Sequence, residues 1–132
     1  MPRLGSLELV YDTGALIAAE RNDRRFWAIH ARALQRQVRP IVPAGCLVEA
    51  WHEGRNSKVA QLLDGCEVEP LNETAAKRAG VLRQRTSDPV GPIDAIVVES
   101  AIRRHAAIVT SDRRDIELLA DAAHRKLQVI DV

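Results

Sequence analysis

The stretch "IDAIVVESAIRRHAAIVTSDRRDIELL", residues 93–119, decides the fold because it contains a complete helix–strand–helix passage. Residues 93–106 form a strongly apolar helical segment, and residues 107–111 form a short apolar run that predicts a buried strand. Helical spacing resumes after that strand. Two carboxylates, Asp112 and Asp115, stand three residues apart directly after the strand, where a simple turn would suffice. Their position raises the question of what chemistry needs two acids there.

The same alternation of short apolar runs and helical segments continues along the whole chain. Strands are expected at 7–11, 40–45, 66–71, 107–111 and 127–132. Helices are expected at 14–20, 23–37, 46–54, 57–65, 72–86, 93–106 and 114–126. Asn72 is expected to cap the helix that follows it, and Gly54 to end the helix before it. Strands that alternate with helices predict an α/β fold with a central, mostly parallel five-stranded sheet and helices on both faces.

Length and composition predict one cytoplasmic domain over residues 1–132. No apolar run approaches the about 20 residues that span a bilayer, and residues 1–12 lack the apolar core of a signal peptide. We therefore expect no membrane association. Arginine supplies 16 of the 19 basic residues, but the net charge of +1 gives no strong nucleic-acid signal. Cys46 and Cys66 are expected to be buried free thiols rather than a disulfide.

Acidic residues recur where the predicted strands end. Asp12 directly follows the first strand and Asp112 follows the fourth. Such positions share the carboxyl edge of a parallel sheet, where ligands bind near the reversal of strand order. Glu49 lies in the helix after the second strand, and Asp94 opens the helix that leads to the fourth. Asp115 can reach the same edge from one helical turn beyond Asp112.

Five carboxylates at one edge would repel one another and resist ionising together. Divalent cations make such a cluster tolerable, and carboxylate oxygens suit Mg²⁺ or Mn²⁺. Two such ions about 3.5–4 Å apart can hold the attacking and leaving oxygens of a phosphodiester displacement. The pattern therefore favours metal-dependent phosphodiester cleavage.

Simpler interpretations of single acids stay open at this point. Asp12 or Asp112 can serve only to cap the helix that follows, because acids are favoured near helix N-termini. Asp94 can be a first-turn acid without any other role. Glu53 competes with Glu49, because it lies one turn later on the same predicted face.

Four segments together resemble the PIN-domain family, and within it the VapC-type ribonuclease toxins of toxin–antitoxin pairs. The segments are "VYDTGALIAAE" (10–20), "VPAGCLVEAW" (42–51), "PIDAIVVESA" (92–101) and "IVTSDRRDI" (108–116), which has the family's T-x-D-x-x-D spacing. The resemblance covers essentially the whole chain in order and spacing. It implies a three-layer α/β/α fold and a metal-dependent endoribonuclease that acts as the toxin of a type II pair.

The resemblance also implies roles for individual residues and partners. The implied catalytic, metal-binding acids are Asp12, Glu49, Asp94 and Asp112, with Asp115 as a fifth metal ligand and Thr13 and Thr110 as supporting residues. The implied cofactor is Mg²⁺ or Mn²⁺, the substrate is RNA, and the implied partners are a second copy of the chain and a small antitoxin protein. Gly14 is a departure, because many members carry Ser or Asn there.

Several alternatives remain. A phosphoreceiver domain would need adjacent acids after the first strand, where this chain has Asp12 followed by Thr13. A stand-alone PIN-like nuclease, a related DNA nuclease and a non-catalytic PIN-like module that binds RNA or protein are the others. Phe26 and Trp27 are adjacent and point in different directions on a helix, and Trp51 lies near Glu49. These aromatic residues indicate either a partner-binding surface or ordinary core packing.

Overall fold

The computed structural model describes residues 7–132, and within that range it contains five strands and seven helices. The strands are β1 (Leu9–Tyr11), β2 (Ile41–Pro43), β3 (Glu67–Glu69), β4 (Ala107–Thr110) and β5 (Val129–Asp131). The helices are α1 (Thr13–Glu20), α2 (Arg24–Gln35), α3 (Ala44–Ala50), α4 (Ser57–Leu63), α5 (Glu73–Gln84), α6 (Pro92–Arg104) and α7 (Arg113–Ala122). Each predicted strand and helix is present.

The five strands form one sheet in the order β3-β2-β1-β4-β5, and every neighbouring pair is parallel. Val10 in β1 pairs with Ile41 on one side and with Ile108 on the other. The chain moves outward from β1 to β3 and then returns through α5 and α6 to β4, on the other side of β1. The strand order therefore reverses between β1 and β4.

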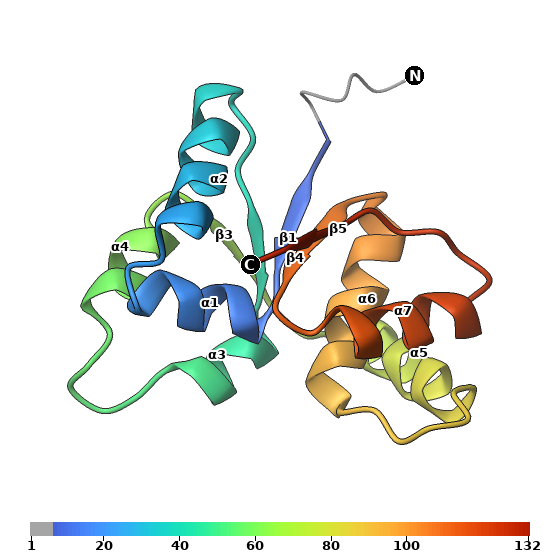
Figure 1. Ribbon diagram of the computed structural model, residues 1–132. Coiled ribbons are helices and arrows are strands. Elements are labelled where there is room, and N and C mark those ends of the chain that lie inside the picture. The colour runs from blue at the N-terminus through green and yellow to red at the C-terminus, as the bar shows by residue number, and fades with distance from the viewer. Residues whose placement is uncertain (1–6) are drawn as a thin grey trace.

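Because crossovers between parallel strands are right-handed, strands added on opposite sides of β1 carry their helices on opposite faces of the sheet. Helices α1 to α4 cover one face, and α5, α6 and α7 cover the other (Figure 1). The three-layer α/β/α architecture that the sequence predicts is confirmed. Within residues 7–132, no helix is both long and apolar enough to cross a membrane.

The core lies on both sides of the central strands. Helix α6 contributes Val97 and Val98, which are fully buried, and this explains why its sequence is so apolar. Phe26 of α2 is also fully buried and packs edge-on against Tyr11, with ring centroids 5.0 Å apart. Trp27 is half-buried, and its Nε1 donates to the carbonyl oxygen of Ala19 at 3.1 Å. Core packing therefore accounts for Phe26 and largely for Trp27, and a partner-binding role for Phe26 is wrong.

The boundaries around α3 differ from those expected. Residues Ala44 and Gly45 belong to the helix rather than to the preceding strand, and the helix ends at Ala50. Trp51 leaves the helix with an extended backbone, so Gly54 lies in the following turn at φ 77° and does not end the helix. The predicted cap of α5 is confirmed, because the Asn72 side chain accepts from the N–H of Ala75 at 2.9 Å.

Both cysteines are buried free thiols, as the sequence predicts.

Candidate metal centre

The reversal of strand order brings two of the predicted acids next to each other. Asp12 follows β1 and Asp112 follows β4, and these strands are neighbours in the sheet. The N–H of Asp12 donates to the carbonyl oxygen of Val109 at 3.2 Å, so the pairing continues to the end of both strands. This edge is the position where open α/β sheets bind ligands.

Three carboxylates form a compact group at this edge. Asp94 in the first turn of α6, Asp112 before α7 and Asp115 in its first turn each offer one oxygen, and these oxygens lie within 4.8 Å of one another. Oxygens held about 2.1 Å from one octahedral Mg²⁺ ion lie about 3.0 Å apart when adjacent and about 4.2 Å apart when opposite. The three carboxylates are therefore near enough to be candidate ligands of one cation, and their oxygens would move closer together to bind it.

Asp12 occupies a buried position beside this group and is only 3% exposed. Its Oδ1 accepts from the N–H of Ala15 at 2.9 Å, and its Oδ2 accepts from the hydroxyl of Thr110. Burial raises the pKa of Asp12, the two hydrogen bonds lower it, and the negative charge of Asp112 raises it. Asp12 therefore does cap α1, as the simpler interpretation proposed, and it lies close enough to Asp112 to feel its charge.

Asp112 differs from Asp12. It precedes α7 at the capping position, but its side chain makes no capping hydrogen bond. Burial raises the pKa of Asp112, and the negative charge of Asp115 raises it further. Asp112 therefore interacts chiefly with its neighbour Asp115, which belongs to the same acidic group.

Asp94 is the electrostatic centre of the site. Burial, and after it the negative charges of the four other predicted acids, together raise the pKa of Asp94 to about 7. In order of decreasing effect these are Asp112, Asp12, Asp115 and Glu49. All five predicted carboxylates are thus close enough to interact, although only three of them meet in the compact group.

Glu49 approaches the site from α3. Its side chain is exposed, and its Oε1 accepts from the hydroxyl of Thr13 at 2.8 Å. Glu53 lies beyond the end of α3, so the two glutamates do not share a helical face. Glu53 was a rival to Glu49 only because the sequence predicted a helix over residues 46–54, and α3 ends at Ala50.

The two threonines named from the sequence both contact predicted acids. Thr13 donates to Glu49, whereas Thr110 donates to Asp12 and accepts from the N–H of Asp112 at 2.8 Å. Thr110 is fully buried. Their part in catalysis stays a prediction. Their hydroxyl groups orient the carboxylates of Glu49 and Asp12.

Two neighbouring residues were not singled out from the sequence. Arg114 donates to Asp115 at 3.1 Å and to Asp88 at 3.0 Å, so a positive charge borders the acidic group. Ser111 lies against the first turn of α1, where its hydroxyl approaches Gly14. Only the folded chain reveals the second contact, because almost one hundred residues separate the two positions.

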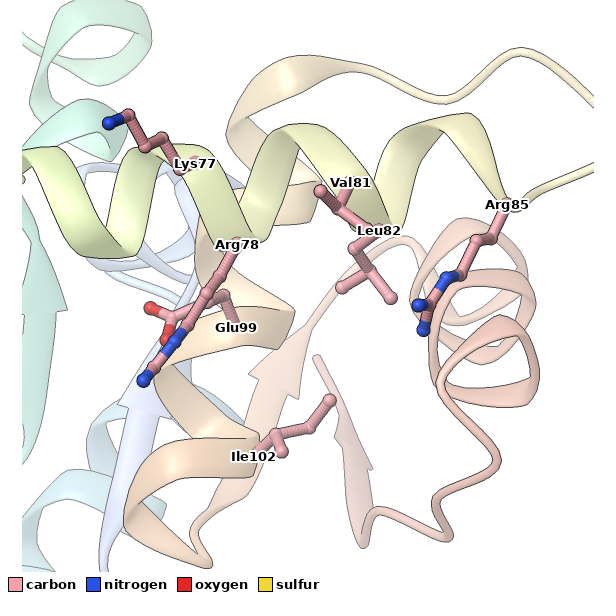
Figure 2. Close-up of a pocket in the computed structure, with 7 residues that line it drawn as sticks. All are labelled: Lys77, Arg78, Val81, Leu82, Arg85, Glu99 and Ile102. Atoms are coloured by element: carbon pink, nitrogen blue, oxygen red, sulfur yellow. The ribbon is translucent and has the colours of Figure 1, made fainter.

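A separate cavity of about 380 Å³ lies between α5 and α6 (Figure 2). Val81, Leu82 and Ile102 supply its apolar wall. Its other lining residues are Lys77, Arg78, Arg85 and Glu99. None of the predicted site residues lines this cavity, so the acidic group is a distinct feature of the molecule.

The sequence model of the family described as PIN domain matches residues 9–123. No curated protein gives a significant match to the sequence.

Several solved structures share the fold. A chain of VapBC2 from Rickettsia felis, bound to a DNA fragment from their promoter, is 14% identical with a TM-score of 0.74; the match covers 96% of this chain and 99% of that one. A chain of DNA-bound VapBC from Salmonella typhimurium is 21% identical with a TM-score of 0.67, covering 95% and 98%. A chain of FitAB bound to the IR36 DNA fragment is 14% identical with a TM-score of 0.65, covering 93% and 94%. The family match spans most of the sequence and the observed fold agrees with it, so the chain belongs to the PIN domain family.

Proposed function

We propose that this protein is a Mg²⁺- or Mn²⁺-dependent endoribonuclease and the toxin of a type II toxin–antitoxin pair. The observation that carries the proposal is the group formed by Asp94, Asp112 and Asp115, with Asp12 and Glu49 close enough to raise the pKa of Asp94. Membership of the PIN domain family supports nuclease chemistry. The likeness in fold to chains from VapBC and FitAB complexes supports the toxin assignment.

The donor set fits a hard divalent cation. All five candidate ligands are carboxylates, which suit Mg²⁺ and Mn²⁺. The one thiol nearby belongs to Cys46, and burial raises its pKa to about 12, so it stays protonated at neutral pH. A divalent cation at this position would offset the mutual repulsion that raises the pKa of Asp94.

The chemistry follows from how the side chains are held. A bound cation would polarise the phosphodiester and make a water molecule more acidic. Asp94, Asp112 and Asp115 would hold that cation. Asp12 keeps one orientation because both of its oxygens accept hydrogen bonds from the protein. Thr13 orients Glu49 through Oε1, and Oε2 accepts no hydrogen bond within residues 7–132, which leaves it available to accept one from substrate or water.

Cleavage of RNA in the presence and absence of metal tests the proposal. The purified protein should cut a mixed panel of transfer, ribosomal and messenger RNA with Mg²⁺ or Mn²⁺, and EDTA should stop the reaction. Asp94→Asn should abolish cleavage. Asp121→Asn is the matched control, because this exposed acid lies in α7 and is not one of the five site acids.

Two results would overturn the nuclease proposal: cleavage that survives EDTA, or an Asp94→Asn variant as active as the parent. If the protein binds RNA or a protein partner but does not cut RNA, it is instead a non-catalytic PIN-like module.

The toxin assignment has its own test. Expression of the protein alone should arrest bacterial growth, and co-expression of a small protein encoded by the neighbouring gene should relieve the arrest and form a stable complex. We also infer a homodimer, which light scattering after size-exclusion chromatography will detect. A monomeric nuclease without a binding neighbour would instead be a stand-alone enzyme, and the metal chemistry would be unaffected.

A further inference from the structure

Gly14 and Ser111 occupy the same small space at the first turn of α1. A Cβ atom on Gly14 would lie 1.9 Å from Oγ of Ser111, 2.9 Å from its Cβ and 3.0 Å from its backbone nitrogen. These separations are far shorter than a van der Waals contact, so position 14 cannot carry a side chain while Ser111 keeps its place. Gly14 is the second residue of α1, and its lack of a side chain leaves the space that Ser111 fills.

Ser111 connects the two elements that deliver the acids. It lies between Thr110 and Asp112 in the turn from β4 to α7, and it packs against the helix that Asp12 caps. Ser111 thus belongs to the turn before α7 and contacts the first turn of α1.

The hydroxyl of Ser111 differs from the other two hydroxyls of the site. Thr13 and Thr110 both donate to carboxylates, so their protons are committed to the protein. Ser111 is exposed, and its hydroxyl makes no hydrogen bond within residues 7–132. Its donor and acceptor capacity is therefore free for a bound ligand or its water.

We propose that Ser111 is a positioning residue of the metal centre. Its hydroxyl supplies the hydrogen-bonding group at the first turn of α1 that Gly14 cannot supply, and it orients water or phosphate oxygens held between Asp12 and Asp112. Positions 14 and 111 share one small space, and in this protein Ser111 is the residue that fills it. The inference rests on the proposed metal-dependent function.

The test is an exchange of the two residues. Three variants separate the steric and the hydroxyl contributions: Ser111→Ala, Gly14→Ser, and the double exchange Gly14→Ser with Ser111→Gly. Ser87→Ala is the matched control, because Ser87 is an exposed loop serine outside the site. The measurements are Mn²⁺ affinity by calorimetry with the metal alone, thermal unfolding without metal, and RNA cleavage.

We expect Ser111→Ala to weaken Mn²⁺ binding or reduce kcat about tenfold, as loss of an outer-shell hydrogen bond does, with an unchanged melting temperature. Gly14→Ser should lower the melting temperature, because two side chains then compete for one space. The double exchange should recover both the melting temperature and most of the metal affinity.

The outcomes separate the two proposals. If the parent protein binds Mn²⁺ and cuts RNA but Ser111→Ala matches it in both, or if the double exchange is no better than Ser111→Ala, the role of Ser111 is wrong and the nuclease proposal stands. If the parent protein neither binds Mn²⁺ nor cuts RNA, both proposals are overturned.

Discussion

Thr110 donates a hydrogen bond from its buried hydroxyl to Asp12, which lies 98 positions earlier in the chain. The same oxygen accepts the N–H of Asp112 at 2.8 Å. One side chain therefore ties together the acids that follow β1 and β4, the two strands between which the sheet order reverses.

Replacing Thr110 with valine should test this link. The change preserves shape but leaves Oδ2 of the buried Asp12 without its donor, so the free energy of unfolding should fall by about 1–3 kcal/mol. Thr110→Ser keeps the hydroxyl and loses one methyl group, worth about 0.8 kcal/mol. Urea denaturation of the metal-free variants measures the difference. If the valine variant is as stable as the serine variant, the hydrogen bond does not stabilise the fold.

Asp94→Asn should have opposite effects on stability and on metal binding. Burial and four negative neighbours raise the pKa of Asp94 to about 7, so its ionised form is unfavourable in the metal-free protein. Asparagine removes that charge, and we expect a higher melting temperature at pH 8 together with loss of Mn²⁺ binding. Differential scanning calorimetry and titration with Mn²⁺ measure the two effects, with Asp121→Asn as control. A variant that melts lower than the parent at pH 8 would contradict the account.

The stability of the metal-free protein should depend on pH through the same residue. Because the pKa of Asp94 is higher in the folded state, its contribution is fully present below about pH 4 and is lost as the pH rises through about 7. Burial lowers the pKa of His30, and this opposes the trend, since an unfolded chain gains a proton there in mild acid. The informative quantity is therefore the difference between the parent and Asp94→Asn.

That difference should favour the asparagine variant increasingly as the pH rises from 4 to 8. Added Mg²⁺ should raise the melting temperature of the parent above pH 7 and leave Asp94→Asn unchanged. If the melting temperatures of the two proteins change equally with pH across this range, the charge of Asp94 does not destabilise the metal-free protein.

The sequence predicted what depends on local patterns. Alternating apolar runs identified all five strands, and acids at the ends of two of them located Asp12 and Asp112 at one edge of the sheet. The end of α3 was missed because Gly54 is a strong local stop signal, yet Trp51 already leaves the helix. Such boundaries depend on tertiary packing, which a sequence pattern does not contain.

The detailed site could not be predicted in the same way. Asp12 both caps α1 and borders the acidic group, so the two interpretations of that residue were never exclusive. The contact between Gly14 and Ser111 joins segments that are adjacent only in the folded sheet. A single sequence shows the glycine but not the serine that fills its space.

Trp51 should contribute to antitoxin binding if the toxin assignment is correct. Its indole is 47% exposed, and Val48 of the neighbouring α3 is 81% exposed, which leaves apolar surface uncovered next to Glu49. Tryptophan side chains that become buried on binding are frequent anchors of protein interfaces. Trp51→Asp should therefore weaken the complex with the antitoxin at least tenfold. The matched control is Val81→Asp, because Val81 is 49% exposed on α5, in the opposite helical layer. Co-purification and calorimetry of both variants decide the matter, and equal weakening by the two substitutions would assign no special role to the α3 surface.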